Sequence, residues 1–152
     1  MKTGNLTIKS AVIDTEIFLR YYNDEEGADK VERILRKIDS GEFKAAISTI
    51  TLSELYYIVG RENRNFSEEI FTELINSNLE IIDLKKNTAR VVGEFKLKYS
   101  KANDPLPIAD AVIAATAFVE KVPVLGEDKH FRKIREIGVV SVDDILTQLS
   151  GT

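Results

Sequence analysis

The stretch that most constrains the fold is Val12-Ile13-Asp14-Thr15, where two β-branched residues are followed at once by a carboxylate. Val12 and Ile13 are typical of a buried strand. An aspartate at the end of such a strand is costly to bury without a partner. Asp14 therefore either caps the helix that begins beside it or lies in a site at the carboxyl edge of a parallel sheet. The tetrapeptide alone leaves both interpretations open.

Short apolar strands alternate with amphipathic helices along the chain. Strands are predicted near residues 10–14, 44–49, 79–83, 122–125 and 138–142. Helices are predicted over residues 15–22, 28–40, 51–60, 67–77, 87–100, 107–120, 128–136 and 143–149. The third helix is expected to begin with a capping box from Thr51 to Glu54, and the fifth to bury Ala89, Val92, Phe95 and Leu97. The alternation is typical of an α/β fold with a central parallel sheet of about five strands flanked by helices.

One domain is expected, because the chain has 152 residues, of which 43 % are hydrophobic. Residues 1–9 are mostly polar and are predicted to be a flexible or partly ordered N-terminal segment before a domain over residues 10–150. No signal peptide and no membrane-spanning run is visible in the sequence. A cytoplasmic location without membrane contact is therefore the expectation.

Four acids occupy positions at which a parallel sheet gathers functional groups. Asp14 ends the first strand, and Asp128 follows the fourth. Glu54 and Asp110 lie in the first turns of helices, and strand ends and helix N-termini share one edge of such a sheet. The four acids can therefore converge. Glu54, Asp110 and Asp128 also have local interpretations, as a capping-box acid, a first-turn acid and a helix cap.

The composition restricts which metal such acids can hold. The chain has no cysteine and a single histidine, His130, so thiolate sites and His-rich zinc sites are excluded. Oxygen ligands favour Mg²⁺ or Mn²⁺, which would relieve the repulsion among clustered carboxylates. A net charge of −4 argues against binding nucleic acid through bulk positive charge, but not against cutting it with bound cations. His130 is expected at the surface or in packing rather than in proton transfer.

Four segments resemble the motifs of the PIN domain family, which contains many metal-dependent ribonucleases. They are residues 12–15, 48–55, 106–117 and 122–131, and the resemblance extends over about residues 11–147. The layout is most similar to VapC-type toxins of toxin–antitoxin pairs. The resemblance implies a metal-dependent endoribonuclease that is dimeric and inhibited by an antitoxin. It also implies an Mg²⁺ or Mn²⁺ cofactor held by the four catalytic acids, Asp14, Glu54, Asp110 and Asp128.

The chain departs from the family pattern at Gly126, where members often carry Ser or Thr. A hydroxyl there would support Asp14 or a metal-bound water, and its loss is expected to weaken that support. Thr15 and Ser53 are candidates for supporting hydrogen bonds, although a helix-start residue and a solvated residue are the simpler interpretations. The basic residues beside Asp128 either contact RNA phosphates or form a solvated helix face. They are Lys129, Arg132, Lys133 and Arg135.

The hypothesis is an endoribonuclease that hydrolyses RNA phosphodiester bonds as a toxin, with RNA, an antitoxin and a second copy of the chain as partners. One alternative is a PIN-fold RNA-processing nuclease without an antitoxin. Another is a catalytically silent module that binds RNA or protein. The aromatic side chains on the early helices are expected either to meet a partner or to pack in the core. They are Phe18, Tyr21, Tyr22, Tyr56 and Tyr57.

Overall fold

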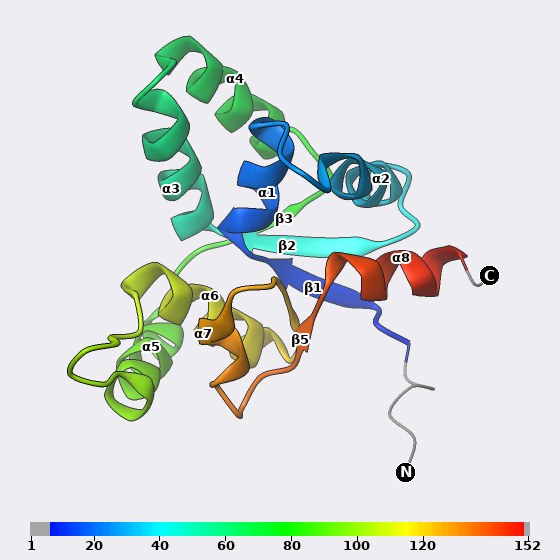
Figure 1. Ribbon diagram of the computed structural model, residues 1–152. Coiled ribbons are helices and arrows are strands. Elements are labelled where there is room, and N and C mark those ends of the chain that lie inside the picture. The colour runs from blue at the N-terminus through cyan, green and yellow to red at the C-terminus, as the bar shows by residue number, and fades with distance from the viewer. Residues whose placement is uncertain (1–6, 151–152) are drawn as a thin grey trace.

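The computed structural model of the protein describes residues 7–150, which form one α/β domain (Figure 1). Its strands are β1 (Ser10–Ile13), β2 (Lys44–Ser48), β3 (Glu80–Ile82), β4 (Val124–Leu125) and β5 (Val139–Val140). Its helices are α1 (Thr15–Tyr22), α2 (Ala28–Asp39), α3 (Thr49–Gly60), α4 (Arg64–Ile75), α5 (Lys86–Tyr99), α6 (Ile108–Glu120), α7 (Lys129–Arg132) and α8 (Val142–Ser150). The strands form one parallel sheet in the order β3-β2-β1-β4-β5, which confirms the predicted fold class.

The sheet separates two apolar cores, and the alternation of side chains along β1 supplies both. Successive side chains of a strand point to opposite faces, so Ala11 and Ile13 lie in one core and Val12 in the other. Helices α1, α2, α3, α4 and α8 cover the first face, and α5, α6 and α7 cover the second (Figure 1). Val12 pairs with Ala46 of β2 and Val124 of β4. A shift of one residue would exchange the buried faces, so this register is strongly specified.

Helix α6 is the most deeply buried helix, and it carries one of the predicted acids. Every residue from 111 to 117 is buried, four of them alanines. These small side chains let the helix lie close to β1, β2 and α5. Pro107 was predicted to be the first helical residue, but it is the N-cap, and α6 begins at Ile108. The buried body of α6 thereby presents its first turn, with Asp110, at the carboxyl edge of the sheet.

Helix α3 begins earlier than its predicted start, and the capping-box prediction is wrong. Ser48 is the N-cap, and its side chain accepts a hydrogen bond from the Ile50 amide at 3.1 Å. Ser48 and Thr51 are both suitable caps by residue type. The end of β2 decides between them, because the chain turns into the helix directly after Ser48. Glu54 therefore has no capping role, and it lies beyond the first turn of α3, where it was predicted.

The predicted buried face of α5 is only partly right. Val92 and Phe95 are buried, whereas Ala89 is exposed and the Leu97 side chain is 87 % exposed. Leu97 lies about 200° around the helix from Phe95, since each residue turns the helix by roughly 100°. The apolar residue therefore points away from α6 into solvent. The predicted helix over 128–136 is likewise shortened to the single turn of α7.

Residues 1–6, most of the predicted N-terminal segment of residues 1–9, lie outside the described residues. Ile8 is tied to α8 through Gln148, whose side chain accepts from the Ile8 amide at 2.5 Å and donates to the Ile8 carbonyl at 2.7 Å. Within residues 7–150, none of the helices combines the length and the apolar character that crossing a membrane requires.

Candidate active site

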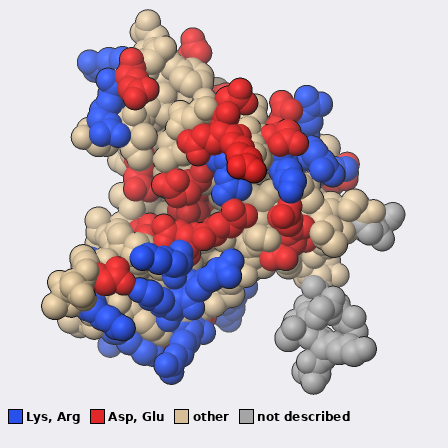
Figure 2. All heavy atoms as spheres, viewed as in Figure 1, with Lys and Arg blue, Asp and Glu red and all other residues tan. Residues whose placement is uncertain are grey.

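The four predicted acids lie along the edge of the sheet where the strand order reverses, between β1 and β4. Asp14 follows β1 directly, and its amide donates to the Leu125 carbonyl of β4 at 2.9 Å. Asp128 follows β4 after two residues. Open α/β sheets bind ligands at this reversal, outside the carboxyl ends of the strands. Figure 2 shows acidic side chains gathered in a band between the two groups of helices.

Asp14 is a buried carboxylate without a compensating partner. Its exposed fraction is 2 %, and its Oδ2 atom has no hydrogen-bond partner. Although Asp14 is the N-cap residue of α1, its side chain makes no capping hydrogen bond. Burial, followed by the negative charges of Asp110, Glu16, Asp128 and Glu54, raises its pKa to about 8. Asp14 therefore does not carry out the capping role that the sequence left open.

Asp110 and Asp128 meet at the imidazole of His130. The His130 Nδ1 atom lies 3.2 Å from Asp110 Oδ2 and 2.8 Å from Asp128 Oδ1. One potential ligand atom from each of these three residues lies within 4.8 Å of the others. Burial, followed by the charge of Asp128, raises the pKa of Asp110 to about 6, while His130 acts in the opposite direction. Asp128 also caps α7, because its Oδ1 atom accepts from the His130 amide at 2.8 Å.

Glu54 reaches the same acidic site from α3 and is held there by two threonines. The Thr15 hydroxyl donates to Glu54 Oε1 at 2.5 Å and is hydrogen-bonded to the Thr51 hydroxyl at 3.1 Å. Both threonines are buried. Thr15 thus occupies the place predicted for a supporting residue. Ser53 does not join this network, since it is exposed and turned away from the buried Thr51 on the same helix.

A paired aspartate faces His130 from its other side. The His130 Nε2 atom lies 3.5 Å from Asp104 Oδ1, and Lys133 donates to Asp104 Oδ2. The Lys133 ammonium holds the pKa of Asp104 below its usual value. Carboxylates that accept the second ring N–H of a histidine fix the tautomer and orientation of metal-ligating imidazoles.

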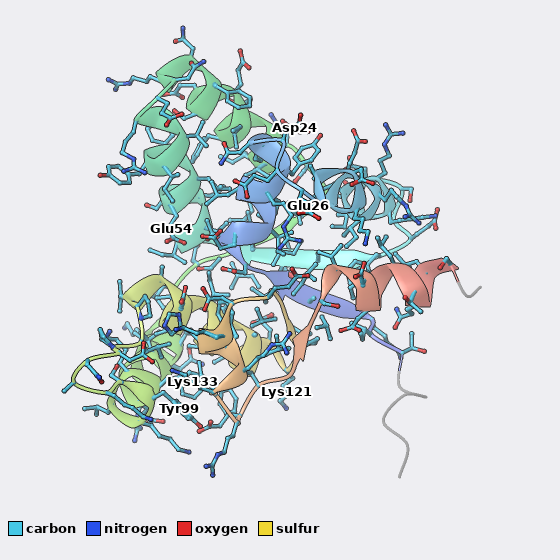
Figure 3. The ribbon with its side chains drawn as sticks, in the orientation of Figure 1. Asp24, Glu26, Glu54, Tyr99, Lys121 and Lys133 are labelled. Atoms are coloured by element: carbon cyan, nitrogen blue, oxygen red, sulfur yellow. The ribbon has the colours of Figure 1, made fainter. Side chains whose placement is uncertain are left out.

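The predicted basic residues surround the acidic site unevenly. Lys129 and Arg132 are exposed, whereas Lys133 is engaged with Asp104. Figure 2 shows Lys and Arg side chains below the acidic band, over the region of α5 and α7. In Figure 3, Glu54 projects from α3 in the upper group of helices and Lys133 lies with α7 in the lower group. The acidic site is therefore bordered by positive charge mainly on the α7 side.

Gly126 lets the backbone of the loop after β4 approach Asp14 closely. A Cβ atom at this position would lie 3.0 Å from Asp14 Cβ and 3.5 Å from Asp14 Oδ2. The hydroxyl of a Ser or Thr residue here would reach the oxygen that lacks a partner. Such a side chain would also crowd Asp14, so the glycine leaves this carboxylate both unsupported and closely surrounded.

The donor atoms of this site fit a divalent cation. Asp14 Oδ2 and His130 Nδ1 are buried polar atoms without hydrogen bonds, and both belong to the acidic site. Carboxylate oxygens suit Mg²⁺ and Mn²⁺, and an imidazole nitrogen suits transition-metal ions. A cation among these groups would relieve the repulsion that raises the pKa of Asp14 and Asp110.

Sequence reasoning overlooked four residues of this site. Thr51 is predicted only as part of a capping box, but it supports Thr15. Glu16, whose charge acts on Asp14, is not predicted as a site residue. His130 is predicted at the surface or in packing, and Asp104 is not predicted as a site residue. The sequence does contain a signal for His130. It lies two residues after the helix cap Asp128, in the same short turn, so its side chain can lie close to that of Asp128. Nothing local signals Asp104, which reaches His130 through the fold of the loop before α6.

The PIN domain family model matches residues 11–137, so the chain belongs to the PIN domain family. The fold is similar to a chain of VapBC2 from Rickettsia felis, solved bound to a DNA fragment from their promoter. The TM-score is 0.71 at 22 % identity, over 87 % of this chain and 98 % of that chain. DNA-bound VapBC from Salmonella typhimurium gives a TM-score of 0.69 at 22 % identity, over 90 % of this chain and 99 % of that chain.

A third solved structure extends the same likeness. VapBC-5 from Mycobacterium tuberculosis, a member of the VapBC family of toxin–antitoxin systems, gives a TM-score of 0.58 at 18 % identity, over 88 % of this chain and 98 % of that chain. No curated protein sequence matches the chain significantly. The predicted resemblance to the PIN domain family is confirmed, and the solved structures that share its fold include chains of VapBC complexes.

Proposed function

We propose that the protein is an Mg²⁺- or Mn²⁺-dependent endoribonuclease that hydrolyses RNA phosphodiester bonds as the toxin of a toxin–antitoxin pair. The observation that carries this proposal is the buried, unpartnered Asp14 carboxylate beside Asp110 and Asp128. A carboxylate in such surroundings is costly to keep charged. A cation that participates in the reaction is the simplest reason to retain it. PIN domain VapC toxins are generally nucleases, and PIN domains typically use a divalent metal.

Each residue of the site has a defined part in this proposal. Asp14, Asp110 and Asp128 hold the cation, and Glu54 completes the acidic site from α3, fixed by the hydrogen bond from Thr15. A divalent cation, when bound, supplies Lewis acidity toward the phosphate and lowers the pKa of water. Because water is the nucleophile, the chain needs no nucleophilic side chain. The products would carry 5′-phosphate and 3′-hydroxyl ends.

The basic residues beside α7 would position the RNA backbone. Lys129 and Arg132 are exposed next to Asp128, where their charges can contact phosphates on either side of the scissile bond. Lys133 would act differently, because its ammonium is already paired with Asp104. Contacts with phosphates orient the substrate and carry no base sequence information.

We also propose an antitoxin protein and a second copy of the chain as partners, from the surface of α3 and α4. Tyr57 is 65 % exposed and Ile75 is 48 % exposed, so apolar area lies open to solvent there. Phe18 does not contribute to it, because this residue is buried in the core. A light-scattering measurement of the molar mass tests the dimer, and a monomer at all concentrations would contradict it.

The nuclease proposal is tested by RNA cleavage with purified protein in Mn²⁺ or Mg²⁺, beside EDTA. The Asp14→Asn and Asp110→Asn variants should lose the activity, because both remove a negative ligand. Asp143→Asn is the matched control, since this exposed acid pairs with Lys30 on the far helices. Metal-dependent cutting that the control retains and both variants lose supports the proposal. Absence of cutting on structured and unstructured RNA would favour the silent binding module instead.

A further inference from the structure

We propose that His130 is itself a ligand of the catalytic cation, through Nδ1, and that this nitrogen makes the site prefer Mn²⁺ to Mg²⁺. The inference rests on the proposed function only in placing a divalent cation among the acids. That His130 is a ligand rests on the groups that surround each of the two imidazole nitrogen atoms.

The Nδ1 atom of His130 is buried, lies within 3.2 Å of the Asp110 and Asp128 carboxylates, and forms a hydrogen bond with neither. A nitrogen lone pair directed toward two carboxylates would be repelled by both. A cation between them removes this conflict, because all three atoms are then ligands. The potential ligand atoms already lie within 4.8 Å of one another, so only a small adjustment would bring them around one ion.

The Nε2 side of the ring is arranged as metal-ligating histidines usually are. Asp104 Oδ1 lies 3.5 Å from Nε2 and Lys133 holds the other oxygen of the same carboxylate. Placing the ring proton on Nε2 leaves the lone pair on Nδ1, which faces the acids. A carboxylate on this side therefore favours the tautomer whose Nδ1 can bind a metal.

The loop that carries Asp104 is fastened at several points, so the carboxylate is well placed to orient the ring. Lys101 and Asp104 exchange two backbone hydrogen bonds of 3.1 Å. The Ser100 hydroxyl accepts from the Leu106 amide at 3.0 Å, and Lys96 donates to the Leu106 carbonyl at 2.5 Å. Asp104 is therefore a positioning residue for His130, although the two are far apart in sequence.

A nitrogen ligand changes which cation the site favours. Mg²⁺ prefers oxygen ligands, whereas first-row transition metals accept imidazole more readily, and Mn²⁺ is the member of that series that also suits carboxylate ligands. An all-carboxylate site would bind the two ions more evenly. The preference for Mn²⁺ over Mg²⁺ is therefore assigned to His130. The acids provide negative charge for either ion.

The test is pulsed electron paramagnetic resonance of Mn²⁺ bound to the untagged protein. The chain has one histidine, so any imidazole nitrogen coupling must come from His130. The wild-type protein should show this coupling and His130→Gln should not. In titrations, His130→Gln should weaken Mn²⁺ binding by roughly tenfold or more and Mg²⁺ binding much less, and Asp104→Asn should weaken Mn²⁺ binding by about tenfold. Asp143→Asn is the control and should match the wild type, and circular dichroism confirms that each variant is folded.

The outcomes separate this inference from the nuclease proposal. Bound Mn²⁺ without imidazole coupling overturns the inference and leaves the nuclease intact. Equal losses of Mn²⁺ and Mg²⁺ affinity in His130→Gln overturn the assigned selectivity. Imidazole coupling in a protein that cuts no RNA supports the inference while the nuclease proposal fails. A protein that binds no Mn²⁺ overturns the inference, and one that binds neither Mn²⁺ nor Mg²⁺ overturns both.

Discussion

The acids of the candidate site and the acids immediately around it are neutralised in different ways. Glu127 pairs with Arg20 at 2.7 Å, and Asp104 pairs with Lys133. Within residues 7–150, Asp14 and Glu54 have no Lys or Arg ion-pair partner, and Asp110 and Asp128 have only His130. Glu127 thus has a counter-charge from the chain, whereas its sequence neighbour Asp128 has none from Lys or Arg among the described residues.

This difference indicates that a bound cation, and not a Lys or Arg residue of the chain, neutralises the acids of the site. A protein that needed its site acids only for folding could pair them as it pairs Glu127 and Asp104. Instead, Asp14 is kept buried, with its pKa raised to about 8 by burial and neighbouring charge. Changes at the unpaired acids of the site should therefore have larger effects than changes at the paired acids beside it.

The largest effect is expected on activity. Removing the charge of Asp110 with Asp110→Asn should lower RNA cleavage by about a thousandfold, since metal stabilisation of the transition state contributes several kcal/mol. The measurement is single-turnover cleavage at saturating Mn²⁺. Glu136→Gln removes a paired acid with the same loss of charge and should leave the rate unchanged. Equal losses in both variants would show that overall charge, not the site, controls the reaction.

The next largest effect is expected on the pH dependence of stability in EDTA. The folded pKa of Asp14 is raised above its unfolded value, so the native state binds more protons between about pH 4 and pH 8. Stability should therefore fall as the pH rises through this window, by up to about 1.4 kcal/mol per pH unit for this group. Asp110 adds to the fall between about pH 4 and pH 6.

Chemical denaturation at several pH values measures this slope. Asp14→Asn has no carboxyl to titrate at this position, so its stability should decline less than that of the wild type. Asp143→Asn, a paired and exposed acid, should keep the wild-type slope. Parallel curves for the wild type and Asp14→Asn would mean that the carboxylate is not strained by its surroundings.

A smaller effect is expected at the hydroxyl that holds Glu54. Thr15→Val removes the donor to Glu54 Oε1 and leaves the buried Thr51 hydroxyl without this partner. A loss of about 1 kcal/mol in stability is expected, with roughly a tenfold loss of activity because Glu54 is no longer oriented. Thr72→Val, at an exposed position on α4, is the control. Unchanged activity in Thr15→Val would contradict the supporting role.

The smallest effect is expected for a paired acid beside the site. Arg20→Gln breaks the ion pair with Glu127, and partly exposed pairs of this kind contribute about 1 kcal/mol or less. Thermal unfolding at low and high salt measures it, and the difference from the wild type should shrink as salt is added. A loss as large as the one caused by ionising Asp14 would remove the contrast between paired and unpaired acids.

The fold was largely predictable because it depends on local patterns. The continuous apolar run of β1 and the apolar body of α6 are both visible in the sequence, and both place acids at the carboxyl edge. The errors arise where two residues satisfy the same local rule. Ser48 and Thr51 are both suitable caps, and only the end of β2 decides between them. Leu97 fits an apolar stripe by residue type alone, yet it faces solvent.

The site was predictable in its acids but not in its nitrogen atom. Asp14, Asp110 and Asp128 each mark the end of a strand or the start of a helix, and the fold brings such positions together. Glu54 lies one turn further into α3 and reaches the same edge. The role proposed for His130 depends on Asp104, which lies 26 residues earlier in the sequence. Asp104 comes close to the imidazole only because of the folded loop before α6. Neither a hydrophobic period nor a sequence motif indicates that these two residues lie close together.

The most direct test of the central claim compares the stabilities of the wild type and Asp14→Asn at about pH 8, in EDTA and in Mn²⁺. In EDTA the variant should be the more stable, because it lacks a buried charge. In Mn²⁺ at about a hundred times the dissociation constant, binding should stabilise the wild type by roughly 2.7 kcal/mol and narrow the gap between the two proteins by that amount. An equal gap in both solutions would contradict the claim that these acids are kept unpaired for a cation.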